Sequence, residues 1–550
     1  MPHFSRVRCA RSGDLSWVPN PSFAFFAKEG GDFEAELRMP PTPSQPTVAV
    51  AGGGLAGLAA ACALSDVGFR VTLFEKRPFL GGRASSWEHP GTGEVVDNCQ
   101  HVLFRVCTNL MEFYHRIGVA DQIRWYDEMT FIEPGGRTSV MKSSLLPAPL
   151  HTAPSFLHFS FLSAADKLAI ARALVPLTLA EQRDTGQSFQ HWLDHHGQTK
   201  HAVERFWRPI LVSALSEELD LISISSAAQV VRESMKSPVA RHMGVPTVPL
   251  TDLYNAAGDY IRARGGVLHF RHPVETFAAD SAQIRIRLKE QEEDRKQNQE
   301  EAFDYLVVAL PFEGLDRVLP EVPESAPIRE QLSHFETSPI TGIHLWFDRQ
   351  ISDLDHAVLL DRTIQWMFHK SRLQPMRSQG TPAPERRETA AHGVSGGLDE
   401  KRDLAPEGRR NTDPADSSES GSYIELVVSS SKTLIDKSRS EIVDLALREV
   451  REFFPAARAA NLVKSTVIKE LHATYSPRPG IDAHRPTAAT RWPRVFLAGD
   501  WTATGWPATM EGAVRSGYLA AEALTRTAGL KDPRFLSPDL PATGLMRLFT

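Results

Sequence analysis

The stretch VAVAGGGLAGLAAACALSDVGFRVTLFEKRPFLGGRAS, residues 48–85, decides the fold of this chain. Its first four residues are small or β-branched and apolar, as in a buried strand, and the Ala- and Leu-rich run from Leu55 predicts a helix. Residues 70–74 predict a second strand, so the stretch is typical of a βαβ unit. Because short apolar runs keep alternating with helical patterns further along the chain, we expect an α/β fold with a Rossmann-like domain.

Three glycines join the first predicted strand to the helix in the pattern Gly52-x-Gly54-x-x-Gly57. Gly52 permits a tight turn, Gly54 lets the backbone approach a pyrophosphate, and Gly57 lets helix and strand pack closely. The N-terminus of the helix offers free N–H groups to phosphates. Glu75 lies 18 residues after Gly57 at the end of the second strand, where a carboxylate accepts hydrogen bonds from a ribose. This context predicts a dinucleotide-binding site.

Length and composition exclude several other classes of protein. At roughly 150 residues per domain, 550 residues predict two to four domains. With 61 basic and 67 acidic residues the net charge is −6, which gives no reason to expect a nucleic-acid partner. Four cysteines without a CxxC pair predict neither a disulfide scaffold nor a metal site, and they favour a reducing, intracellular setting.

Residues 47–64 are 18 residues without a charged side chain, which reaches the lower length of a membrane-spanning helix. Glycines interrupt this run, and Asp66 and Arg70 soon follow it. A βα unit buried in a large domain has the same mean hydropathy, and we favour that interpretation over a membrane span.

A second glycine turn follows Glu75, where Lys76 leads into Gly81-Gly82-Arg83. This turn resembles that of the amine oxidase and carotenoid desaturase superfamily of FAD enzymes, in which it lies along the phosphates of the flavin. The resemblance implies FAD as the cofactor. It also implies a Rossmann-like FAD-binding domain, of the glutathione reductase and amine oxidase type, with an interleaved α+β substrate-binding domain. The alternative is a structural turn with a surface arginine.

The C-terminal part of the chain supplies a second half of this implied site. An apolar run at 495–498 leads into Gly499-Asp500, and a turn at 510–513 opens a predicted helix. By the resemblance, Gly-Asp contacts the pyrophosphate and ribityl section, and the helix dipole favours the anionic reduced flavin. Val274 is implied to back the adenine, although it could equally be a core residue. The implied cofactor-binding residues are Gly52, Gly54, Leu55, Ala56, Gly57, Glu75, Lys76, Gly82, Arg83, Val274, Gly499, Asp500, Met510, Glu511, Gly512 and Ala513.

Further segments narrow the resemblance to one family. They are DNCQHV at 97–102, LPAPL at 146–150, FWRPI at 206–210, YSPRPG at 475–480 and the block 498–521. Their combination resembles the hydroxysqualene dehydroxylases, the squalene-associated FAD-dependent desaturase-like enzymes of bacterial hopanoid synthesis. The resemblance implies reductive dehydroxylation, in which a hydride from reduced flavin replaces the allylic hydroxyl of hydroxysqualene and gives squalene.

Loss of the hydroxyl group needs a proton or hydrogen-bond donor, because general acid catalysis lowers the barrier for a poor leaving group. We expect His101 to be this donor, Tyr475 to be the next candidate, and Asp97 to orient it. A lone histidine near a flavin loop is often structural, and this alternative stays open.

Three rival functions also fit parts of the sequence. A carotenoid-type desaturase would use the flavin oxidatively on a polyprene and shares every cofactor motif. An amine oxidase would need an aromatic cage, for which Trp501 and Trp506 are candidates. A flavin-binding escort protein without turnover is the third.

We expect two interleaved domains rather than separate units. The predicted segments are a disordered leader at 1–46, FAD-binding parts at 47–145, 251–320 and 486–530, a helical substrate- and membrane-facing region at 146–250, a substrate domain at 321–485 with a disordered insertion at 371–421, and a tail at 531–550. Met39 is an alternative start of translation.

Residues 143–177 are rich in Leu, Phe and Ala, and Phe156, Phe159, Phe161 and Leu162 predict either an exposed, substrate-facing surface or the core of a helical subdomain. The implied polyprenyl substrate is insoluble in water. We therefore expect a cytoplasmic protein that touches the inner face of the membrane peripherally through residues 145–162. Hand-over of hydroxysqualene from the upstream synthase is a further expectation.

Overall fold

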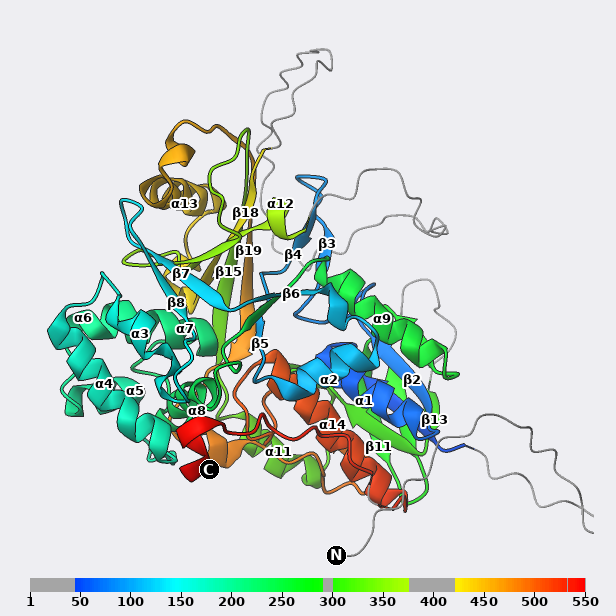
Figure 1. The fold of residues 1–550 in the computed structure, drawn as a ribbon. Coiled ribbons are helices and arrows are strands. Elements are labelled where there is room, and N and C mark those ends of the chain that lie inside the picture. Colours follow the sequence, from blue (N-terminus) through cyan, green and yellow to red (C-terminus); the bar gives the residue numbers. More distant parts are fainter. Residues whose placement is uncertain (1–44, 290–299, 375–420, 532, 550) are drawn as a thin grey trace, which may run out of the picture. The chain divides into compact units, whose positions relative to one another are not determined.

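The predicted βαβ unit lies at the centre of a five-stranded parallel sheet (Figure 1). The computed structural model describes residues 45–289, 300–374, 421–531 and 533–549. The strand order is β10-β2-β1-β14-β20. The central strand β1 therefore has β2 on one side and β14, a strand from much later in the sequence, on the other. The carboxyl ends of these strands meet at one edge, where doubly wound sheets bind dinucleotides. The strands are β1 (Thr47–Ala51), β2 (Arg70–Glu75), β10 (Val267–Phe270), β14 (Tyr305–Val308) and β20 (Val495–Leu497).

Helices cover one face of this sheet. They are α1 (Leu55–Asp66), α2 (Thr108–Arg116), α9 (Leu250–Arg262) and α14 (Met510–Thr527). Every residue of α1 except Asp66 is buried, which explains the charge-free run because a helix buried on all sides needs no polar face. A side chain at Gly517 would place its Cβ 2.2 Å from the Ala56 oxygen, so α14 crosses α1 where only glycine fits. In the described part of the chain, no helix has the length and apolar composition needed to cross a membrane.

A small antiparallel sheet and two helices cover the other face. Phe74 of β2 and Leu306 of β14 contact this layer through a shared apolar core. The layer contains β11 (Val274–Ala279), β12 (Ile284–Leu288), β13 (Glu300–Phe303), α10 (Phe312–Val318) and α11 (Ala326–Leu332).

A seven-stranded sheet forms the second half of the fold, in the order β19-β15-β18-β17-β16-β7-β8. The helix α13 (Arg439–Phe453) covers one face and a helical region covers the other. The strands are β7 (Glu128–Ile132), β8 (Thr138–Lys142), β15 (Thr337–Phe347), β16 (His356–Leu359), β17 (Trp366–His369), β18 (Tyr423–Ser429) and β19 (Leu462–Tyr475).

An aromatic core holds the helical region together. Phe159 and Phe161 stack with their ring centroids 4.8 Å apart, and both are almost fully buried, as is Leu162. The expectation of an exposed or substrate-facing surface is therefore wrong for these three residues, which form core as the alternative interpretation proposed. The helices are α3 (Ala153–Leu157), α4 (Ala164–Leu179), α5 (Phe189–His195), α6 (Lys200–Ala202), α7 (Arg208–Leu215) and α8 (Ile224–Met235), with a π-helical turn at Val203–Trp207.

Short elements connect these layers. They are β3 (Ser86–Glu88) with β4 (Val95–Asp97), β5 (Leu103–Phe104) with β6 (Ile123–Tyr126) and β9 (Met243–Pro246), α12 (Lys370–Leu373) and the 3₁₀ turns Ala120–Gln122, Leu150–Thr152, Pro323–Ser325, Ser431–Leu434, Pro455–Arg458, Ile481–His484 and η8 (Gly544–Leu548).

Two segment boundaries differ from the prediction. β7 and β8 lie within the predicted first FAD-binding segment, yet they extend the seven-stranded sheet because β7 pairs in parallel with β16. The predicted insertion joins β17 and β18, which are antiparallel neighbours, but its first residues form α12. The rest of the insertion, residues 375–420, and the leader up to residue 44 with Met39 lie outside the described residues.

Candidate active site

The glycine loop forms a cradle of bare backbone at the carboxyl end of β1. Gly52 has a φ of +111° and donates its N–H to the Phe74 oxygen at 2.8 Å. A Cβ at Gly57 would lie 1.9 Å from the Gly52 oxygen, so helix and loop are packed as closely as backbone allows. Gly54 caps α1, whose first residues Leu55 and Ala56 are buried. The N–H groups at this helix end are therefore available to a phosphate.

Glu75 fixes the shape of this cradle. Its carboxylate accepts the Gly53 N–H at 2.7 Å and the Arg77 N–H at 2.8 Å, and its side chain is buried. An ionised carboxylate has about four acceptor positions, so capacity remains for a ribose hydroxyl. Lys76, in contrast, is exposed.

The Gly81-Gly82-Arg83 turn lies directly against the glycine loop. Gly81 donates its N–H to the Gly53 oxygen at 2.9 Å, and a Cβ at Gly82 would lie 3.0 Å from the Cα of Gly54. Both glycines of the turn have positive φ angles, which side-chain-bearing residues rarely adopt. The two glycine-rich motifs therefore form one surface for a pyrophosphate.

Arg83 joins the two ends of the sequence. Its guanidinium donates to Asp500 Oδ1 at 2.7 Å and to the Ala473 oxygen at 2.8 Å. Asp500 follows Gly499, whose N–H is held by the Ser516 hydroxyl of α14 at 2.8 Å. The structure thus brings together both halves of the predicted cofactor site, 417 residues apart along the chain.

The turn that opens α14 presents backbone rather than its acidic side chain. The Glu511 carboxylate accepts the Leu110 N–H at 2.8 Å and the Asn109 N–H at 3.2 Å, so it caps the start of α2. Thr509 caps α14, because its hydroxyl accepts the Gly512 N–H. The Met510 sulfur accepts a hydrogen bond from the Tyr254 hydroxyl, and Ala513 is half-buried. We conclude that the Met510–Ala513 turn offers a cofactor its helix N-terminus.

Val274 is the first residue of β11. Two residues earlier, the backbone N–H of His272 donates to the backbone carbonyl oxygen of Glu75. The side chain of Val274 is half-buried and packs against the core below the sheet. Val274 thus packs against the core beside the predicted ribose site, and its contact with the adenine stays a prediction.

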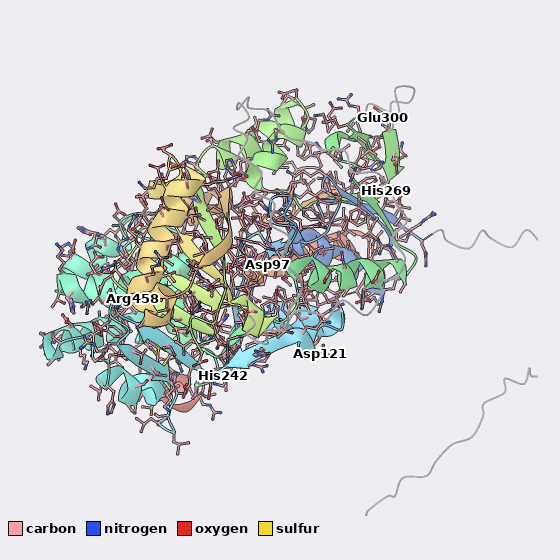
Figure 2. All side chains as sticks on the ribbon, turned by 90° about the horizontal axis from the view of Figure 1, so that it is seen from above. Asp97, Asp121, His242, His269, Glu300 and Arg458 are labelled. Atoms are coloured by element: carbon pink, nitrogen blue, oxygen red, sulfur yellow. The ribbon has the colours of Figure 1, made fainter. Side chains whose placement is uncertain are left out.

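The predicted catalytic loop, residues 97–101, packs against β15, where a Cβ at Gly342 would lie 3.1 Å from the Asn98 oxygen. Figure 2 labels Asp97, which is buried. Asp97 accepts hydrogen bonds from the Ser86 hydroxyl at 2.5 Å and the Leu250 N–H at 3.3 Å. Its other oxygen lies 2.6 Å from Lys370 Nζ. Among the described hydrogen bonds, none joins Asp97 to the His101 or Tyr475 side chain. Asp97 anchors the loop, and its predicted orienting role stays a prediction.

Lys370 and Glu425 complete a buried cluster that the sequence did not reveal. Lys370 Nζ also lies 2.9 Å from Gln100 Oε1 and 3.6 Å from Glu425 Oε2. Burial raises the pKa of Glu425 to about 8, and the nearby Lys370 ammonium offsets this only in part. Burial alone would raise the pKa of Asp97, but the Lys370 ammonium holds it below its usual value. Of the two carboxyl groups, Glu425 therefore holds a proton more readily than Asp97 does.

His101 is held as a neutral ring. Its Nδ1 lies 2.7 Å from the Cys99 carbonyl oxygen, which can only accept, so Nδ1 carries the hydrogen. Burial lowers the pKa of His101, which favours the neutral form. Nε2 is then an acceptor, so His101 suits a base or a hydrogen-bond acceptor better than the predicted acid.

Tyr475 lies at the other end of the site. It lines a small recess with Arg83, Asp500 and Trp501, and its ring meets Phe335 edge to face at 5.6 Å. Burial raises the pKa of Tyr475 above its ordinary value, so its hydroxyl keeps its proton. Tyr475 therefore has the donor chemistry that the sequence assigned first to His101.

The two tryptophans proposed for an amine cage are core residues in different clusters. Trp501 donates its indole N–H to the Leu310 oxygen at 2.9 Å, while Trp506 packs against Val106 and Ala240. A cage needs paired aromatic faces around an open space, and these two rings do not provide one.

The amino-acid sequence is similar to those of carotenoid desaturases. The chain is 27% identical to a 15-cis-phytoene desaturase of Synechococcus elongatus, covering 87% of this chain and 95% of that protein. It is 25% identical to the 15-cis-phytoene desaturase of Arabidopsis thaliana, covering 92% and 86% of the two chains.

Solved structures share the fold. An oxidoreductase from Methanosarcina mazei superposes with a TM-score of 0.61 at 15% identity, covering 86% of this chain and 98% of that one. A putrescine oxidase variant gives a TM-score of 0.60 at 13% identity, covering 88% and 99%. The flavin-containing amine oxidoreductase family matches residues 55–525. The glycine cradle, Glu75, Arg83 and Asp500 fit the FAD that this family binds. The chain therefore belongs to the flavin-containing amine oxidoreductases, with FAD as its cofactor.

Proposed function

We propose that this oxidoreductase removes the allylic hydroxyl of hydroxysqualene reductively and forms squalene. When bound and reduced, FAD supplies a hydride. The C–O bond breaks, the hydroxyl leaves as water with a proton from a donor, and the hydride forms the new C–H bond. The combined motifs at 97–102, 146–150, 206–210 and 475–480 support this choice within the family.

The observation that carries the proposal is the place of Tyr475, whose hydroxyl can donate a hydrogen bond. Tyr475 lies in the recess where Arg83 and Asp500 join the halves of the cofactor site. A hydroxyl at this position can stabilise a leaving hydroxide by donating a hydrogen bond to it. We assign the donor role to Tyr475.

The decisive experiment is anaerobic. The holoenzyme is photoreduced and mixed with hydroxysqualene, and products are identified by mass spectrometry. We expect squalene together with oxidised flavin. Failure to form squalene, with a normal flavin spectrum, would overturn the proposal.

Desaturation of a polyprene is the second candidate, and the neutral His101 favours it. A free Nε2 acceptor could take the proton that a desaturation releases, and phytoene and ζ-carotene desaturases are among the relatives. The same preparation, oxidised and given phytoene with a quinone acceptor, tests this candidate. Dehydrogenated carotenoid without squalene formation would select it over the first.

A further inference from the structure

Two segments far apart in the sequence join to form an exposed apolar surface. We call residues 145–150 and 545–549 the two-segment surface. Leu545 donates its N–H to the Ala148 oxygen at 2.8 Å, and Arg232 of α8 donates to the Phe549 oxygen at 3.0 Å. A Cβ at Gly544 would lie 2.7 Å from the Ala148 nitrogen, so the C-terminal turn is packed tightly against the loop. In Figure 1 this turn is the red element beside the helical region.

The side chains on this surface are apolar and point outward. Leu145 is fully exposed and Leu548 is 76% exposed, although both are among the most apolar residue types. Leu146, Leu150, Leu545 and Phe549 are each more than 40% exposed. Single exposed leucines are common, but six on two adjoining segments mark an interaction site.

Charge identifies the kind of partner. Residues 143–163 contain no Asp, Glu, Lys or Arg, and residues 540–549 contain Arg547 as their one charged residue. The surface therefore has no acidic side chain to repel anionic headgroups, and Arg547 adds an attractive cation. The leucines project from a loop and two short 3₁₀ turns, which offer neither a helix groove nor a strand edge to a protein partner.

We infer that the two-segment surface docks the protein on an anionic lipid bilayer, with Leu145 and Leu548 inserting among the acyl chains. The C-terminal turn is thus half of the contact that residues 145–162 alone were expected to make. Phe159 and Phe161 of that range take no part because they are buried. Vesicle binding is measured without turnover, so its outcome is independent of whether the proposed reaction is correct.

Co-sedimentation of the full-chain holoenzyme with sucrose-loaded vesicles tests it. We expect binding to vesicles of phosphatidylcholine with phosphatidylglycerol, and weaker binding to phosphatidylcholine alone. Leu145→Asp and Leu548→Asp should each lower the vesicle partition coefficient about tenfold, and Arg547→Gln should reduce the preference for phosphatidylglycerol. Val463→Asp, at a 60% exposed position on β19, is the matched control and should bind like the wild type.

Two results would overturn the inference. In one, the wild type stays in the supernatant with both vesicle compositions. In the other, the Leu548→Asp variant binds vesicles as well as the Val463→Asp variant does, which would show that the C-terminal turn does not contribute to docking. Mass measurement of the same variants completes the test, because a dimer that only Leu145→Asp and Leu548→Asp dissociate, without vesicle binding, would identify a second copy of the chain as the partner instead.

Discussion

Lys370 Nζ lies 2.6 Å from Asp97 Oδ2, and the two side chains are 1% and 2% exposed. The pair joins the seven-stranded sheet to the loop that follows the Gly-Gly-Arg turn. Removing one partner of a buried pair leaves an uncompensated charge, which typically costs about 3–5 kcal/mol. We expect Lys370→Met to lower the free energy of unfolding by this amount and to weaken FAD binding by loosening the loop.

Urea unfolding and flavin fluorescence titration measure both effects. Asp97→Asn combined with Lys370→Met should recover part of the lost stability, because no buried charge of that pair is then left alone. Lys142→Met is the control, since its ion pair with Glu128 is exposed and contributes at most about 1 kcal/mol. Equal losses in the Lys142 and Lys370 variants would contradict the assignment.

Glu425 predicts a dependence of stability on pH. Burial raises its pKa to about 8 from an ordinary value of 4.5. Between these values the folded chain keeps a proton that the unfolded chain releases, so the free energy of unfolding falls as pH rises through this window. Glu425→Gln is neutral throughout and should remove that fall, being more stable than the wild type by about 2–4 kcal/mol at pH 8 but nearly equal at pH 5.

The measurement is the difference in unfolding free energy between Glu425→Gln and wild type across pH 5–9. Other titrating groups around this site, namely Asp97, Cys99, His101, His344, Lys370, Tyr423 and Glu470, are present in both proteins. Their own titration therefore largely cancels in the difference. A difference that stays constant with pH would show that Glu425 is ionised in the folded chain.

The cofactor site was predictable because its motifs are local in the sequence. The buried cluster of Asp97, Lys370 and Glu425 was not, because it depends on strands that are far apart in the sequence. Gly52, Gly57 and Glu75 belong to one βαβ unit, so their spacing in sequence fixes their spacing in the fold. Lys370 and Glu425 meet Asp97 only because β17 and β18 pair on either side of a long insertion. Sequence spacing carries no signal for such a contact.

The same distinction applies to the predicted role of His101 and to the predicted apolar surface. The acid role of His101 was inferred from residue type, but the Cys99 carbonyl fixes its tautomer and burial keeps it neutral. The core role of Phe159 and Phe161 follows from packing against β7, through contact with Phe131. Apolar composition alone does not tell a buried cluster from a surface.

A single added methyl group at Gly57 should weaken the binding of FAD. The added Cβ would lie 1.9 Å from the Gly52 oxygen, so Gly57→Ala must push α1 away from the glycine loop. We expect FAD affinity to fall about 100-fold or more, because the helix N-terminus no longer faces the pyrophosphate. Gly91→Ala, where only the flexible His89 side chain is near, should keep a normal flavin content. Flavin absorbance of the purified variants measures this, and a yellow Gly57→Ala protein would contradict the cradle.

Tyr475→Phe distinguishes the donor role from a structural one. It removes the hydroxyl and keeps the ring that packs on Phe335, so FAD binding and thermal stability should stay near wild type. Loss of a general acid typically costs about 10²–10⁴-fold in rate, and we expect single-turnover squalene formation to fall by at least the lower figure. His101→Gln keeps a hydrogen-bonding side chain and should cause a smaller loss. If the order is reversed, with His101→Gln nearly unable to form squalene and Tyr475→Phe active, the proton comes from the His101 side of the site and the donor role assigned to Tyr475 is wrong.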